Sequence, residues 1–173
     1  MKKFAIFSFI IFALTISAFG QKTKTTVKVD STKPVREAFD RLVEGIKQAD
    51  AEKVMSVYDK SDKILFFNNN GSATIGWETM KKNRDSSYDK ATNVNLELTG
   101  LRLEMLGSDS AYLTNKWKQS QEYDGKLETA SGRMTIVFKK IGKDWKAVHL
   151  HTSPDNPPAS RPVLSSEREV IVN

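Results

Sequence analysis

The pattern of apolar residues in the first half of the chain predicts three helices and one short strand. Over 35–46, apolar side chains recur every three or four residues with charged ones between them, which is the period of a helix that buries one face. Asp50 can cap a shorter helix over 51–58, and a third helix is expected over about 77–88. The compact apolar run 63–67 is typical of a strand, and an asparagine-rich turn follows it.

The second half of the chain alternates between apolar and polar residues, which predicts long strands. They are expected over 93–106, 111–121, 127–139 and 145–152, with glycine-containing turns between most of them. The apolar parity shifts at Gly100, which predicts a bulge or sharp bend in the first strand. Helices followed by antiparallel strands indicate an α+β fold. We expect three N-terminal helices packed on a strongly curved antiparallel sheet, forming a cone with an internal pocket.

The first twenty residues have the order of a secretory signal peptide. Two lysines precede an uncharged, mostly apolar run over 4–19, and the small residues Ala18 and Gly20 suit cleavage before Gln21. An uncleaved membrane anchor is the alternative, but the run is shorter than the roughly 20 residues that a spanning helix needs. We therefore predict a periplasmic or secreted protein that leaves the membrane after cleavage of residues 1–20.

The rest of the chain divides into three parts. Residues 21–31 are polar and predict a flexible spacer, residues 32–153 carry the predicted domain, and residues 154–173 predict a proline-rich tail. One domain of this size can form a hydrophobic core without disulfides.

Charge and cysteine content exclude several kinds of site. The chain has 27 lysines and arginines against 21 aspartates and glutamates, and removal of residues 1–20, with two lysines, leaves an excess of about four. The basic residues are scattered and form no block with aromatic residues, so no nucleic-acid partner is expected. The chain has no cysteine, which excludes disulfides, thiolate metal sites and cysteine nucleophiles. No cofactor is expected.

Two long segments resemble SnoaL-like proteins of the nuclear-transport-factor-two-like superfamily. Residues 46–82 (IKQADAEKVMSVYDKSDKILFFNNNGSATIGWETMKK) resemble the opening of these proteins, and 132–153 (GRMTIVFKKIGKDWKAVHLHTS) resemble their closing hairpin. Trp117 stands where they often carry a tryptophan. The resemblance covers 35–153 and implies a cone-shaped fold that commonly dimerises through the outer face of its sheet. Relatives include ketosteroid isomerase, polyketide cyclases, scytalone dehydratase and the association domain of calmodulin-dependent kinase, alongside members that only bind or assemble.

The histidines His149 and His151 are candidates for acid/base chemistry. They lie two residues apart on a predicted strand, so their side chains share one face. They could also ligate a metal, but a third ligand would have to be a carboxylate, so no metal site is expected. Packed or interfacial histidines are the alternative, because the resemblance to the kinase domain implies that alternate residues line the pocket. That parity places Val148, Leu150 and Thr152 toward the pocket, and Trp145, Ala147, His149 and His151 outward.

Arg133 is the expected polar anchor of the pocket. It begins an apolar strand segment, and a guanidinium in an apolar cavity can pair with both oxygens of a carboxylate. An arginine that reaches out to water is the alternative. The aromatic residues expected to line the pocket are Tyr58, Phe67, Trp77 and Trp117.

Three functions follow from these residues. The preferred one is a dimeric protein that binds an unidentified small molecule, either carboxylate-bearing or aromatic. The second is an enzyme of the isomerase, cyclase or dehydratase type, with Asp59, Asp62, His149 or His151 as acid or base and Tyr58 as donor. Against this, acids after a short helix are often turn formers, and Lys60 and Lys63 can neutralise them. The third is an assembly module without a ligand.

Overall fold

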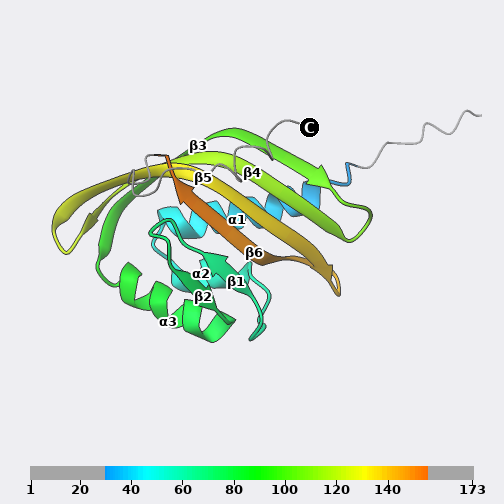
Figure 1. Cartoon of the computed structure of the whole chain (residues 1–173), viewed down its shortest axis with the longest axis horizontal. Coiled ribbons are helices and arrows are strands. Elements are labelled where there is room, and N and C mark those ends of the chain that lie inside the picture. Colours follow the sequence, from blue (N-terminus) through cyan, green and yellow to red (C-terminus); the bar gives the residue numbers. More distant parts are fainter. Residues whose placement is uncertain (1–29, 156–173) are drawn as a thin grey trace, which may run out of the picture.

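The computed structural model describes residues 30–155, in which helices precede long strands as predicted (Figure 1). The helices are α1 (Lys33–Lys47), α2 (Ala51–Ser56) and α3 (Trp77–Tyr88). Two short strands, β1 (Leu65–Phe67) and β2 (Ala73–Ile75), lie between α2 and α3 in the sequence. The four long strands are β3 (Ala91–Met105), β4 (Ser110–Tyr123), β5 (Lys126–Ile141) and β6 (Asp144–Pro154).

The predicted signal peptide over 1–20 lies outside the described residues, as do most of the spacer 21–31 and of the tail 154–173. Within 30–155, no helix has the length and apolar character that crossing a membrane requires.

Local sequence accounts for the first two helices. Pro34 suits the first turn of α1, and Phe39 and Leu42 lie on its buried face. This face packs against α2, β3 and β6. The cap predicted for α2 is present, because the Asp50 side chain accepts a hydrogen bond of 2.9 Å from the backbone N–H of Lys53.

Helix α2 ends two residues earlier than the sequence predicts. The carbonyl of Val57 accepts a hydrogen bond from the N–H of Ala147, and the carbonyl of Ala147 accepts one from Asp59. Tyr58 thereby forms a parallel bridge to β6 instead of a last helical turn. The pairing with β6 overrides the helical pattern, and it fixes Tyr58 against the sheet.

The six strands form one open sheet in the order β2-β1-β6-β5-β4-β3. All neighbouring pairs are antiparallel except β1 and β6, which run parallel. The expected antiparallel sheet is present, and the β1–β6 pair makes it mixed. No hairpin joins β1 to β6, because residues 68–143 lie between them, so turn geometry does not force them to run in opposite directions.

Bulges bend the long strands over α1, as Figure 1 shows. The β3–β4 register shifts between Thr99 and Arg102, around Gly100, whose φ is 63°. This confirms the bulge predicted at Gly100. A second shift lies between Thr92 and Asn95, where Asn93 has a φ of 53°. Each extra residue increases the local twist, and the sheet becomes concave toward the helices.

A third bulge corrects the predicted alternation along β6. Val137 pairs with His149 and Phe138 with Ala147, so Val148 is the extra residue on β6. Before the bulge Trp145 and Ala147 are buried in the core, whereas they were expected to face outward. After it, the parity is the predicted one, with Leu150 facing inward.

The hydrophobic core occupies one half of the concave side and leaves the other half open. On β4 and β5 the fully buried residues include Leu113, Ile136 and Phe138, which lie toward the turns that connect these strands to β3 and β6. Phe39 of α1 and Phe66 of β1 complete this core. Toward the β4–β5 hairpin the same two strands carry fewer buried apolar side chains, and a cavity lies there.

Candidate functional site

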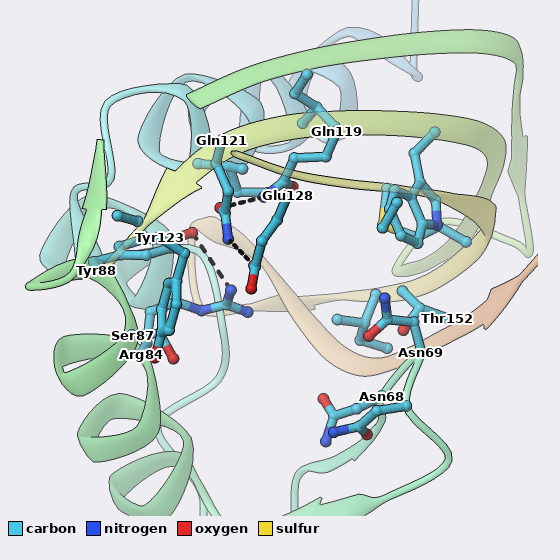
Figure 2. A pocket seen from close by; sticks show the side chains of 18 of the residues that line it. Asn68, Asn69, Arg84, Ser87, Tyr88, Gln119, Gln121, Tyr123, Glu128 and Thr152 are labelled. Carbon is cyan, nitrogen blue, oxygen red and sulfur yellow. Dashed lines mark hydrogen bonds between the residues drawn. The ribbon is translucent and has the colours of Figure 1, made fainter. Parts of the chain in front are cut away.

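The cavity has a volume of about 760 Å³ and lies between α1, α3 and the concave face of β3–β6 (Figure 2). Its apolar surface comes from Leu42, Ile46, Ala91, Leu96, Met134 and Leu150. Its aromatic residues are Tyr58, Tyr88, Trp117 and Tyr123. Its polar residues include Asn68, Asn69 and Asn70 of the β1–β2 turn, Arg84 and Ser87 of α3, and Gln119, Gln121 and Glu128 of the β4–β5 hairpin.

Strand β4 provides one continuous inward face that changes from apolar to polar. Alternate residues point to the same side of a strand, so Leu113, Asn115, Trp117, Gln119 and Gln121 share the concave face. Leu113 belongs to the core, and Trp117 and the two glutamines line the cavity. Both polar side-chain atoms of Asn115 and the indole Nε1 of Trp117 are buried without a hydrogen-bond partner within the described structure. The polar change along β4 therefore marks the boundary between core and cavity.

The two glutamines form a short hydrogen-bond chain to a carboxylate. Gln119 Nε2 donates to Gln121 Oε1 at 2.9 Å, and Gln121 Nε2 donates to Glu128 Oε2 at 3.3 Å. Gln121 and Glu128 are also directly paired across the β4–β5 hairpin. This chain, drawn as dashed lines in Figure 2, orients the exposed Glu128 carboxylate in the cavity wall.

Helix α3 contributes a polar stripe to the opposite wall. Arg84, Ser87 and Tyr88 stand three and four residues apart, so they share one helical face. The Arg84 guanidinium lies 5.2 Å from the centre of the Tyr88 ring, and its Nη1 donates to the Tyr88 hydroxyl over a long 3.4 Å. The buried Nε of Arg84 has no hydrogen-bond partner within the described structure. Arg84 therefore carries unused donors into the cavity.

Tyr58 is a neutral donor in this site. Its side chain is nearly fully buried, and its ring packs edge-on against Phe66. Burial raises the pKa of Tyr58 far above its ordinary value, and the positive charge of Arg84 offsets only part of the rise. Burial raises the pKa of Tyr88 as well, again opposed by Arg84. Both phenols stay protonated at neutral pH and can donate hydrogen bonds to a bound molecule.

The structure brings only part of the predicted site together. Tyr58 and Trp117 line the cavity, but Arg133, Phe67 and Trp77 do not. Arg133 is exposed on the outer face of β5, between the inward residues Gly132 and Met134, and donates to the carbonyl of Pro154 at 3.4 Å. Arg133 is thus not the pocket anchor that the sequence indicated, because its strand parity points it away.

Trp77 and Phe67 have other surroundings. The indole Nε1 of Trp77 donates to the carbonyl of Met55 at 3.0 Å, and Lys60 lies over its ring. Phe67 is on the outer face of β1, edge-on to His149 and His151, with ring centres 5.7 Å and 5.5 Å away. Both aromatic side chains stabilise contacts between elements outside the cavity.

The predicted acid and base candidates also lie outside the cavity. Asp59, Asp62, His149 and His151 are not among its lining residues. Lys60, expected to neutralise the aspartates, instead pairs with Glu78 at 3.5 Å. Among residues 30–155, no group of three or more histidines, aspartates and glutamates is arranged to hold a metal ion.

Sequence reasoning missed most of the polar cavity residues. The missed side chains are Arg84, Ser87, Tyr88, Gln119, Gln121, Tyr123, Glu128 and the asparagines 68–70. Two signals could have found them. One is the polar stripe at helical spacing on α3, and the other is the parity that β4 shares between the core residue Leu113 and the glutamines.

Known proteins share this fold. Residues 35–157 match the family model of the SnoaL-like domain. No curated protein has a significant sequence match to the chain.

Among solved structures, a nuclear transport factor 2 (NTF2-like) superfamily protein from Salmonella enterica serovar Typhimurium LT2 aligns with a TM-score of 0.66 and 20% identity over 75% of this chain and 94% of its own. A ketosteroid isomerase-like protein from Erwinia carotovora atroseptica aligns with a TM-score of 0.63 and 14% identity, over 74% of this chain and 98% of its own. An NTF2-like protein from Cytophaga hutchinsonii aligns with a TM-score of 0.62 and 16% identity, over 73% of this chain and 99% of its own. At these identities the likeness concerns the fold, and function has to be argued from the cavity.

Proposed function

The chain belongs to the SnoaL-like domain family, and we propose that its domain binds one small organic molecule in the cavity between α1, α3 and the sheet. The observation that carries this proposal is the composition of the cavity wall. About 760 Å³ is enough for an organic ligand, and the wall combines aliphatic and aromatic side chains with many polar ones that can orient a bound molecule.

The wall residues favour a ligand with a flat or apolar body. Tyr58, Tyr88, Trp117 and Tyr123 supply four aromatic rings, and Leu42, Met134 and Leu150 are among the aliphatic side chains between them. Aromatic rings bury a large area with little loss of side-chain freedom. The neutral hydroxyl of Tyr58 then offers a directed hydrogen bond.

Binding is better supported than acid/base catalysis. An isomerase or dehydratase mechanism needs a base next to the substrate, and the four candidates expected from the sequence lie away from the cavity. Of the lining residues only Glu128 is a carboxylate, and this exposed side chain accepts a hydrogen bond from Gln121. The exported location expected from residues 1–20 stays a prediction.

A thermal-shift and calorimetric test on residues 21–173 would use naphthol, naphthoate and a steroid as probes. We expect at least one to stabilise the protein by several degrees. Ala130 lines the cavity and is exposed, so Ala130→Trp fills the mouth with little effect on the core. This variant should weaken binding at least about tenfold.

Glu97→Trp is the matched control, because Glu97 is exposed on the outward parity of β3. It should bind each probe as the wild type does. Binding that survives Ala130→Trp unchanged would place the ligand elsewhere and contradict the proposal.

A further inference from the structure

Arg84 and Glu128 are the charged side chains of the cavity. Among the lining residues Arg84 is the one cation and Glu128 the one anion. Arg84 stands on α3 and Glu128 on β5, and Figure 2 shows both side chains extending into the cavity. A ligand that enters there meets both charges, so their state determines which ligand charge is favoured.

The guanidinium of Arg84 is incompletely satisfied. It has five N–H donors, and the long bond to the Tyr88 hydroxyl uses one of them. Its Nε is buried without a partner, and none of the ion pairs formed by residues 30–155 includes Arg84. A buried donor without an acceptor costs free energy, which an arriving acceptor recovers.

The acidic side chains beside this part of α3 form ion pairs with Lys81 and not with Arg84. Lys81, one turn earlier on α3, pairs with Asp85 at 2.7 Å and with Glu52 at 2.8 Å. Lys81 is thus neutralised on both sides, whereas Arg84 keeps its charge free on the cavity side of the helix. The contrast within a single helix shows that the charge of Arg84 is not part of a surface ion-pair network.

Two glutamines fix the position of the Glu128 carboxylate, which competes with a ligand carboxylate for Arg84. Gln121 Nε2 donates to its Oε2, and Gln119 in turn supports Gln121. Glu128 is exposed, so its charge is well solvated and attracts Arg84 weakly. A ligand carboxylate that reaches the buried side of the guanidinium can form the shorter, charge-assisted bonds that Glu128 does not make.

Trp117 adds a second donor for a ligand that extends inward. Its buried Nε1 has no partner within the described structure. On β4 it precedes Gln121 by four residues, which corresponds to about 13 Å along a strand. Arg84 and Trp117 both line the cavity, so a ligand with its anion at Arg84 and a distal acceptor can also use the indole N–H.

We propose that the cavity selects organic carboxylates, with Arg84 as the anchor of the anionic group and Glu128 as an internal competitor that moderates the affinity. The inference rests on the proposed binding function and narrows it to one ligand charge. The ligand class is a monocarboxylate with a flat apolar body, for which naphthoate is the probe and naphthamide its neutral isostere.

The test measures the affinities of naphthoate and naphthamide by calorimetry on residues 21–173. We expect the wild type to prefer naphthoate by about tenfold or more, since charge-assisted hydrogen bonds are about twice as strong as neutral ones. Arg84→Met should remove this preference and leave naphthamide binding within about twofold. Glu128→Gln should strengthen naphthoate binding by about two- to fivefold, because it removes a like charge.

Arg133→Met is the matched control, because Arg133 is an exposed arginine on the outer face and its loss changes net charge equally. It should leave both affinities unchanged. Arg84→Lys keeps the positive charge but lacks the paired N–H donors of the guanidinium, so it should retain part of the preference for naphthoate. It also tests the role of the charge if Arg84→Met misfolds. Circular dichroism of each variant confirms the fold.

Three results would overturn the proposal. Equal binding of the two compounds, with both lost in Ala130→Trp, would refute the carboxylate preference and leave the binding function standing. Failure of both compounds to bind the wild type would count against the binding function as well. An equal loss in Arg84→Met and Arg133→Met would assign the effect to net charge alone.

Discussion

Tyr58 shows how one residue couples the site to stability. Its buried phenol has a raised pKa in the folded protein, whereas in the unfolded chain the pKa is about 10. Above that pH the unfolded state releases a proton that the folded state keeps, so the folded state loses stability as pH rises. The free energy of unfolding should therefore fall less in Tyr58→Phe than in the wild type between about pH 8 and about pH 11, by roughly 1 kcal/mol.

Urea unfolding of wild type and Tyr58→Phe at the two pH values measures this difference. Tyr88→Phe is the companion variant and should act in the same direction, because burial also raises the pKa of Tyr88. An alkaline loss of the same size in wild type and Tyr58→Phe would show that the phenol ionises equally in both states.

At the residue scale, the sequence predicted an arginine in the cavity but indicated the wrong one. The interpretation called for an arginine anchor with aromatic neighbours, and the structure has Arg84 where Arg133 was expected. Arg133 was expected to face inward because it precedes an apolar run, but its neighbours Gly132 and Met134 occupy the inward positions. A glycine gives no parity signal, so the pattern around Arg133 could not be resolved from the sequence.

Strand β5 contains a close contact that depends on Gly132. A Cβ at this position would overlap the carbonyl oxygen of Ser153 on β6 and would lie 3.0 Å from Cζ2 of Trp117. The backbone of β6 cannot yield as a flexible side chain does, so we expect Gly132→Ala to destabilise the fold by about 1–3 kcal/mol. It should also displace the Trp117 ring.

Chemical unfolding and tryptophan emission measure the two effects of Gly132→Ala. Ser131→Ala serves as the control at the adjacent, outward position and should change neither by much. Unaltered stability in Gly132→Ala would mean that β5 and β6 separate easily at this end of the sheet.

At the element scale, periodicity predicted the order of helices and long strands but not every face or partner. The bulge at Gly100 left a parity shift in the sequence and was predicted. The bulge at Val148 left none, because Ala147, Val148 and His149 fit either parity, and the burial of Trp145 was therefore missed. The parallel pairing of β1 with β6 joins segments far apart in sequence, which no local pattern encodes.

At the scale of the whole molecule, the sheet has two faces with different chemistry. The concave face carries the core and the cavity, whereas the outer face carries His149, His151 and Phe67. The Phe67 side chain remains 41% exposed beside the two histidines, and Ile75 of the neighbouring strand is exposed as well. The homodimer expected from the family resemblance would cover this region.

We predict that the protein is a homodimer and that Phe67 lies in its interface. Phe67→Asp would place a charge in an apolar contact, and burial of an unpaired charge is strongly unfavourable, so the dimer should dissociate to monomers. Leu106 is 55% exposed in the turn between β3 and β4, which makes Leu106→Asp a matched control that should remain dimeric. Size-exclusion chromatography with light scattering over a range of concentrations distinguishes the two states. A monomeric wild type, or equal dissociation in both variants, would refute the role of this face. Selective dissociation by Phe67→Asp would assign self-association to the outer face of the sheet, opposite the cavity.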